Sequence, residues 1–212
     1  MFPKPYIMNR TSISLILFSL ISIHSIGQTN YIRLPAVGVS FLLNDYVTPQ
    51  RIRSESLAQV VHNGNWAHIN QMGSGIGLHY FQGLFNHLDF EANISGSFVR
   101  NILPGEVSDD NSFLVEADAS VNIKLVTDHY FFTPYLALGA GAGKYQVYYS
   151  AFVPVGIGFK FNLFDEAAIF LSSQYRIPVT TETNNFHFMH SIGIAGVISQ
   201  KKPALVKPLS GS

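Results

Sequence analysis

Six charged side chains occupy alternate positions in stretches whose same face otherwise carries small polar residues. They are Glu91, Glu116, Asp118, Lys124, Lys160 and Arg176. Charges buried inside a fold must pair, because an unpaired buried charge is strongly destabilising. We predict one ion pair between Glu91 and Lys124, near one end of two neighbouring strands. We predict a second between Glu116 and Arg176, near the opposite end, so that the charges form a plug. A proton or ion path is the alternative use of these residues.

A serine beside a histidine could act as nucleophile and base, and His190 and Ser191 are adjacent. Neighbouring residues of a strand point to opposite faces, so this pair cannot meet. His187 and Ser191 share a face but would lie about 13 Å apart at the rise of a strand. The runs Gly73–Gly77 and Gly139–Gly143 lack the spacing of a phosphate-binding loop and fit a crowded interior instead. We therefore predict no catalytic residue, no cofactor and no enzyme activity.

The segment Asn44–Gln71 is the longest connection predicted, and it holds two histidines and the only tryptophan. His62 and His68 could bind a metal or a ligand, but two histidines six residues apart in a loop are usually solvated, and we assign no metal site. Trp66 has two interpretations. It is a contact residue for a surface partner, or a lid packed on the mouth of a barrel.

Hydrophobic residues recur at every second position over most of the chain, which is the period of a strand and not of a helix. The clearest runs are Leu88–Phe98 and Phe113–Leu125. Six further segments alternate in the same way: Val37–Leu43, Ser74–Phe81, Pro134–Gly143, Ala151–Phe161, Ala167–Ile177 and Phe186–Ile198. The sequence thus predicts an all-β fold of eight antiparallel strands, each long enough to cross a bilayer when tilted.

Longer and shorter connections alternate along the chain. The longer ones are Asn44–Gln71, Asn101–Asn111, Lys144–Ser150 and Pro178–Asn185, and the short ones are Gln82–His87, Thr127–Phe132 and Asn162–Glu166. This alternation is typical of an up-and-down transmembrane barrel, with both chain ends on the periplasmic side. An open sheet in lipid would leave edge amides unpaired, so the first and last strands must pair. Eight strands enclose room only for their own side chains, which argues against a diffusion pore.

Alternation alone does not say whether the apolar face meets lipid or a protein core, and a soluble lipocalin-like ligand-binding barrel is the alternative. Charged residues are 12% of the chain and hydrophobic residues 47%, so an exterior in water would be poor in charge. Aromatic residues gather near strand ends, where membrane barrels carry two girdles. We assign Phe85, Phe90, Tyr130, Phe131, Phe132, Phe161 and Phe164 to the short-turn end, and Phe98, Tyr145, Tyr148, Tyr149, Phe152 and Phe188 to the other. These features favour a lipid-facing wall.

The N-terminal segment has the features of a signal peptide: basic residues, a short apolar run and small residues before Gln28. The apolar run is about 11 to 14 residues, shorter than the roughly 20 that a spanning helix needs. We predict a signal peptide over 1–27, a barrel over 28–199 and a periplasmic tail rich in proline and lysine over 200–212. Translation starts at Met1 or Met8. The chain has no cysteine, which excludes disulfides and thiolate metal sites.

From about Tyr31 to Ser199 the chain resembles the OmpA-type eight-stranded outer-membrane barrels, on strand number, loop alternation, girdles and signal peptide. Its tail looks like the start of the linker that joins such barrels to a peptidoglycan-binding domain, which is not found here. The resemblance implies outer-membrane lipid and lipopolysaccharide as partners, a possible surface or host partner, no nucleic acid, and a monomer. It implies a structural, membrane-integrity or adhesion role. A lipid-modifying outer-membrane enzyme is the alternative.

Overall fold

The computed structural model describes residues 32–100, 112–163 and 166–198. All of these belong to the unit Tyr31–Ser212, and the separate unit Met1–Asn30 lies outside the described residues. The predicted signal peptide and its cleavage point, the loop over 101–111, Phe164 and the tail from 200 therefore also lie outside them.

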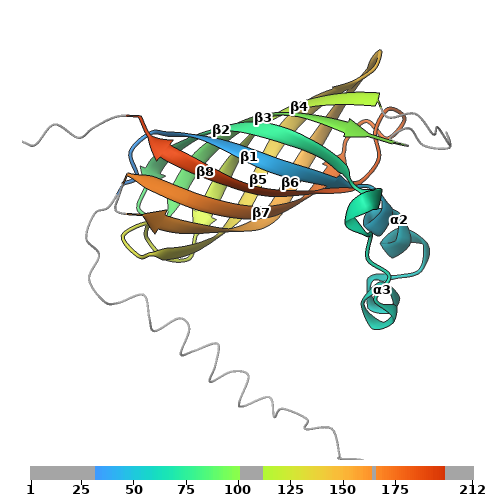
Figure 1. Cartoon of the computed structure of the whole chain (residues 1–212), viewed down its shortest axis with the longest axis horizontal. Helices are drawn as coiled ribbons and strands as arrows, with labels where there is room; N and C mark the ends of the chain where they lie inside the picture. Colours follow the sequence, from blue (N-terminus) through green and yellow to red (C-terminus); the bar gives the residue numbers. More distant parts are fainter. Residues whose placement is uncertain (1–31, 101–111, 164–165, 199–212) are drawn as a thin grey trace, which may run out of the picture. The chain divides into compact units, whose positions relative to one another are not determined.

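Eight antiparallel strands close into a barrel in simple chain order, with β1 hydrogen-bonded to both β2 and β8 (Figure 1). The strands are β1 Ala36–Asp45, β2 Gly73–Phe85, β3 Leu88–Val99, β4 Ser112–Lys124, β5 Phe132–Tyr145, β6 Tyr148–Leu163, β7 Ala167–Pro178 and β8 His187–Val197. The predicted all-β, up-and-down, eight-stranded barrel is confirmed. Closure leaves no edge strand, which a wall in lipid requires.

The barrel is polar inside and apolar outside. Along β3, Asp89, Glu91 and Asn93 are buried in the lumen, whereas Ile94 and Phe98 are exposed on the outer surface. A soluble barrel would have the opposite arrangement, because its apolar side chains fill the interior. The lipocalin-like alternative is therefore wrong.

The predicted long loop Asn44–Gln71 contains helical structure. It folds into α2 Val47–Ser54, α3 Leu57–Asn63 and the short 3-10 helix η2 Ile69–Gln71. Local capping explains both α-helices: the Asp45 carboxylate accepts the amides of the first turn of α2, and the Ser56 hydroxyl accepts the Gln59 amide in α3. Gly64 ends α3 with a left-handed backbone, φ 65°. Of the helices in the described residues, none has the length and apolar character to cross a membrane.

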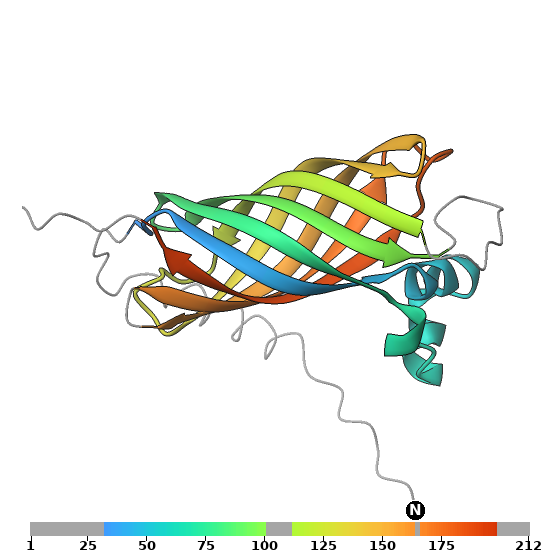
Figure 2. The same ribbon diagram turned by 45° about the horizontal axis from the view of Figure 1, so that its top comes forward.

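The connection between β5 and β6 is much shorter than predicted. Both strands extend to a hairpin whose tip is Gln146 and Val147, and Tyr145 pairs with Tyr148. Gln146 has φ 53°, as a tight hairpin turn requires. The predicted intermediate loop Lys144–Ser150 is therefore largely strand, and the hairpin belongs to the same barrel end as α2 (Figure 2).

Candidate functional site

The lumen is the polar site of this molecule. The structure places all six predicted charged residues inside the barrel, with exposed fractions from 0% for Arg176 to 6% for Asp118. Strands β3, β4, β6 and β7 supply them, each from positions that alternate with lipid-facing residues. Because the side chains of one face are two residues apart, the register between strands decides which charges meet.

The cluster nearest the helical end of the barrel is centred on Arg176. Its guanidinium lies 2.6 Å from the Glu116 carboxylate and 2.7 Å from the Asp118 carboxylate. Asn93 also donates to Asp118, at 3.0 Å, and His187 lies 3.5 Å from Glu116. The expected pairing of Glu116 with Arg176 is thus present, and Asp118 joins it. A fork-shaped guanidinium suits this arrangement because it can serve two carboxylates at once.

The pairing predicted between Glu91 and Lys124 is wrong. Glu91 is opposite Ser120 in the β3–β4 register, so Lys124 lies further toward the short-turn end. Glu91 instead contacts His79 Nδ1 at 3.0 Å and accepts the Asn122 amide at 2.6 Å. The sequence signal for His79 was its place on the polar face of the second strand.

A second cluster, at the short-turn end, is built around Asp89. Lys124 Nζ lies 2.6 Å from one carboxylate oxygen of Asp89, and Lys160 Nζ lies 2.8 Å from the other. Lys124 also contacts Asp128 at 2.7 Å, and Arg33 lies 4.0 Å from Asp128. Asp89 was visible as a polar-face residue. Asp128 and Arg33 lie outside the strands, where alternation gives no information.

Aromatic and aliphatic side chains fill the lumen between and beyond these charges. Near the short-turn end, Phe81 and Phe170 pack edge to face at 5.2 Å, and Lys160 Nζ lies 4.9 Å from the Phe81 ring. At the helical end, Val99, Leu114 and Tyr145 form a buried cluster against which Tyr46 packs. These side chains occupy the lumen between and around the two ion clusters.

Tyr46 packs over the lumen at the helical end of the barrel. Its ring stacks on His187 at 4.4 Å. Burial, with the Glu116 carboxylate nearby, raises the pKa of the Tyr46 hydroxyl well above its ordinary range. Trp66 is 46% exposed, so its side chain is not buried against the barrel mouth as Tyr46 is. His62 and His68 are both exposed, and the described part of the chain contains no group of three or more possible metal ligands.

One hydrogen-bonded chain in the lumen has the residue order of a hydrolase triad, and the sequence analysis missed it. Ser40 Oγ lies 2.8 Å from His79 Nε2, and His79 Nδ1 lies 3.0 Å from Glu91. Catalysis needs room for a substrate beside the hydroxyl. A methyl group added at Gly77 would already lie 2.8 Å from Ser40 Oγ and 3.0 Å from His79 Nε2. The hydroxyl is enclosed, and the arrangement satisfies buried polar groups.

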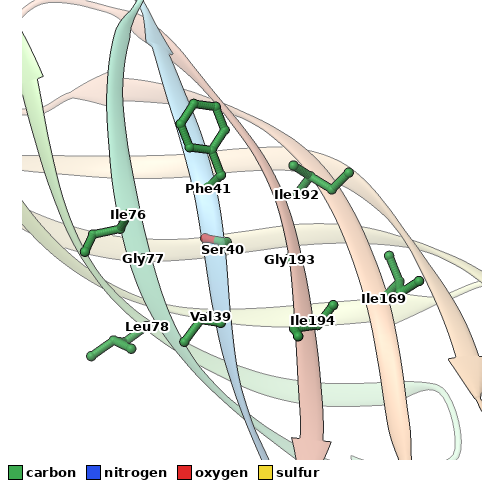
Figure 3. Close-up of a pocket in the computed structure, with 10 residues that line it drawn as sticks. All are labelled: Val39, Ser40, Phe41, Ile76, Gly77, Leu78, Ile169, Ile192, Gly193 and Ile194. Carbon is green, nitrogen blue, oxygen red and sulfur yellow. The ribbon is translucent and has the colours of Figure 1, made fainter.

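A groove of about 540 Å³ crosses the outer surface over Ser40. In Figure 3, Ser40 lies between Gly77 and Gly193, and apolar side chains such as Phe41 and Ile194 border them. The groove exists because the central row carries only small residues. It is on the opposite side of the wall from the Ser40 hydroxyl, which bonds His79 in the lumen.

The outer surface carries a broad apolar belt. Its exposed members include Val39, Ile76, Leu78, Ile94, Leu138, Ile157 and Ile194. Of the predicted girdle residues, Phe85, Tyr130, Phe131 and Phe132 are exposed at the short-turn end, and Phe98, Tyr148 and Tyr149 at the other. Tyr145 and Phe152 are buried, so their assignment to a girdle is wrong. Phe152 lies in the lumen beneath Arg176, at 4.6 Å from its guanidinium.

No protein-family model matches the sequence, and no match to it was found among curated proteins. Solved structures do match the fold. OprG from Pseudomonas aeruginosa aligns with a TM-score of 0.50 and 11% identity over 78% of this chain and 96% of its own. The chain has the fold of an outer-membrane eight-stranded barrel.

Two further structures have TM-scores just below that of OprG. Neisserial surface protein A has a TM-score of 0.49 and 11% identity, covering 77% of this chain and 95% of its own. Ail, the attachment invasion locus protein of Yersinia pestis, has a TM-score of 0.48 and 12% identity, covering 77% and 98%. The apolar exterior fits this fold class, because only hydrocarbon is a favourable solvent for such a belt. The barrel has the fold and the apolar exterior of an outer-membrane barrel.

Proposed function

We propose that this protein is a non-enzymatic outer-membrane barrel that contributes to membrane integrity, and that its filled lumen makes it a rigid scaffold instead of a pore. The observation that carries the proposal is the pair of buried ion clusters around Arg176 and Asp89. Arg176, Lys124 and Lys160 each have a carboxylate partner at hydrogen-bond distance, so these charges hold one another and are not free to conduct ions.

Conductance tests the first half of the proposal. The purified barrel, refolded and added to a planar lipid bilayer, should give no stable conductance steps. Arg176→Ala provides the matched comparison, because it removes the largest side chain of the cluster at the helical end and should raise the frequency of transient openings. A steady open channel in the unmodified protein would contradict the proposal.

The phenotype of a deletion strain tests the second half. Cells without the gene should become more sensitive to detergents and bulky antibiotics, which an intact outer membrane excludes. A plasmid copy of the gene should restore resistance. Unchanged sensitivity under envelope stress would count against a membrane-integrity role.

Adhesion through extracellular segments is a second candidate function, favoured by the tip of the β5–β6 hairpin. Val147 and Tyr149 are 77% and 69% exposed at this tip. Lys144 Nζ lies 5.3 Å from the Tyr149 ring, so a cation accompanies the apolar surface and could also contact lipopolysaccharide phosphates. Cells carrying Val147→Ser with Tyr149→Ser should bind host cell surfaces less than wild-type cells. Equal binding would remove this hairpin from any adhesive role.

The alternative of a lipid-modifying enzyme has no support from the Ser40 chain, whose hydroxyl is buried in the lumen against His79. Mass spectra of lipid A from cells with and without the gene should be identical. A mass difference that disappears with Ser40→Ala would overturn the non-enzymatic proposal.

A further inference from the structure

The excursion between β1 and β2 has a composition unsuited to a loop in water. From Ser56 to Met72 it contains no aspartate, glutamate, lysine or arginine. It nevertheless exposes four large apolar side chains: Leu57 at 55%, Val61 at 56%, Trp66 at 46% and Ile69 at 75%. Soluble surfaces seldom combine a lack of charge with so many exposed apolar residues in one short segment.

The excursion is folded and tied to the barrel rim. Arg53 of α2 lies 4.1 Å from the Phe186 ring beside β8. Arg51 donates to the backbone carbonyls of Asn65 and Trp66 at 3.1 Å each. Thr48 accepts the Ala67 amide at 2.9 Å. The backbone around Trp66 is therefore held against α2, and its exposed side chain is part of an ordered structure.

The helices lie beside the rim and not over the mouth. Both views show α2 at the end of the barrel wall and the α3 segment displaced to the side, away from the barrel axis (Figures 1 and 2). Tyr46, at the base of α2, packs over the lumen instead. A segment displaced sideways at the rim of a membrane-spanning barrel meets the surface of the surrounding bilayer.

The apolar surface of the excursion continues into the lipid-facing wall. Leu57 and Val61 are one turn apart on the same face of α3, while Val60 between them is buried. Ile69 lies in η2, which directly precedes β2, and β2 exposes Ile76 and Leu78 to lipid. The exposed residues thus follow one another from the wall onto the excursion without a charged residue between them.

We propose that α3 and η2 lie in the outer leaflet, at the boundary between headgroups and acyl chains, with Trp66 as an interfacial anchor. This inference rests on the outer-membrane location of the barrel. Tryptophan favours this boundary, and short amphipathic helices bury their apolar face about 5–10 Å into it. Arg51 and Arg53 with Glu55 give the preceding stretch a net positive charge, which suits the anionic phosphates of the leaflet. The occupant of this surface is lipid.

The single tryptophan of the chain makes a direct test possible. The full-length mature protein is refolded into vesicles containing phospholipid brominated near the headgroup end of its acyl chains. Bromine quenches tryptophan only at close contact, so emission from Trp66 should fall roughly twofold relative to unbrominated vesicles, given the shallow depth expected. Aqueous iodide should quench it weakly.

Two variants supply the controls. Leu57→Ser with Ile69→Ser retains Trp66 but removes apolar surface, and it should lose most bromine quenching and gain iodide quenching. Val147→Ser with Tyr149→Ser makes a matched change at the hairpin tip and should leave both signals as in the wild type. If the first variant were quenched by bromine like the wild type, α3 and η2 would not be what holds Trp66 in lipid, and the inference would be wrong.

Heat-modifiable mobility on a denaturing gel, measured on the same vesicles, shows whether the barrel has inserted. It therefore distinguishes failure of this inference from failure of the proposed function. A barrel that inserts but has Trp66 open to iodide and unaffected by bromine overturns the inference and leaves the outer-membrane proposal standing. Trp66 shielded from both quenchers indicates a protein contact, such as a second copy, and also overturns it. A chain that does not insert at all would refute the proposed function itself.

Discussion

Replacement of Arg176 by methionine should destabilise the barrel more than any other single change of a charged residue in the lumen. The guanidinium is fully buried and is the cation nearest to both Glu116 and Asp118. Methionine keeps much of the volume, so the loss is mainly electrostatic. His187 would still contact Glu116, and Asn93 would still donate to Asp118.

The expected cost follows from leaving buried charges without a partner. Removing one member of a buried ion pair costs about 3–5 kcal/mol. Because two carboxylates lose the same cation, we expect a loss in the upper half of that range, about 4–5 kcal/mol. A triple variant, Arg176→Met with Glu116→Gln and Asp118→Asn, removes every charge of this cluster. It should recover most of the loss, since a buried ion cluster and a neutral replacement are often similar in stability.

Urea unfolding of the refolded protein in lipid vesicles measures these differences, with Trp66 emission and gel mobility as probes. Arg53→Met is the matched control. The Arg53 guanidinium contacts the Phe186 ring at the rim, and its removal should lower the free energy of unfolding by no more than about 1 kcal/mol. Equal stability of the two single variants, or a triple variant as unstable as Arg176→Met, would refute the argument that paired buried charges hold the lumen.

Further predictions concern the short-turn cluster, the lumen packing and the outer belt. Asp89→Asn should lower the unfolding free energy by about 3 kcal/mol in the same urea assay, because two lysines share this carboxylate; a change within experimental error would contradict the pairing. Gly158→Val should cost about 1–3 kcal/mol through collision with the buried Tyr135 ring, and near-ultraviolet circular dichroism should change with it. Leu138→Arg, in the middle of the lipid-facing side of β5, should cost about 2–4 kcal/mol, whereas Val147→Arg at the hairpin tip should cost under about 1 kcal/mol. Equal costs at these two sites would argue against a membrane around the wall.

The fold was predictable from the sequence because strand period and connection length are local signals. Alternation over Leu88–Phe98 and Phe113–Leu125 located β3 and β4 and assigned their polar face to the lumen, and the low charge content identified lipid as the outer solvent. The pairing of individual charges was less predictable, because it depends on register. Knowing that Glu91 and Lys124 share a face does not say that Glu91 is opposite Ser120.

The features missed are those set by tertiary contacts. Tyr46 and Trp66 are both aromatic residues of one connection, and only the structure shows that Tyr46 packs on His187 and the buried cluster while Trp66 is exposed. The helices α2 and α3 are short, and the residues that accept their first-turn amides, Asp45 and Ser56, are weak sequence signals. Tyr145 shortly precedes the exposed Tyr148 and Tyr149 in sequence, but the continuation of β5 turns its side chain inward.

The central claim is that hydrocarbon surrounds the outer face of this barrel while its charges face one another within. The chain has no native cysteine, so single cysteines carrying spin labels can be placed at Leu78, Ile94 and Leu138 without a background signal. In vesicles, these labels should be mobile, relaxed strongly by oxygen and shielded from a water-soluble nickel reagent. Labels relaxed by nickel, or immobilised as in a protein core, would contradict the account.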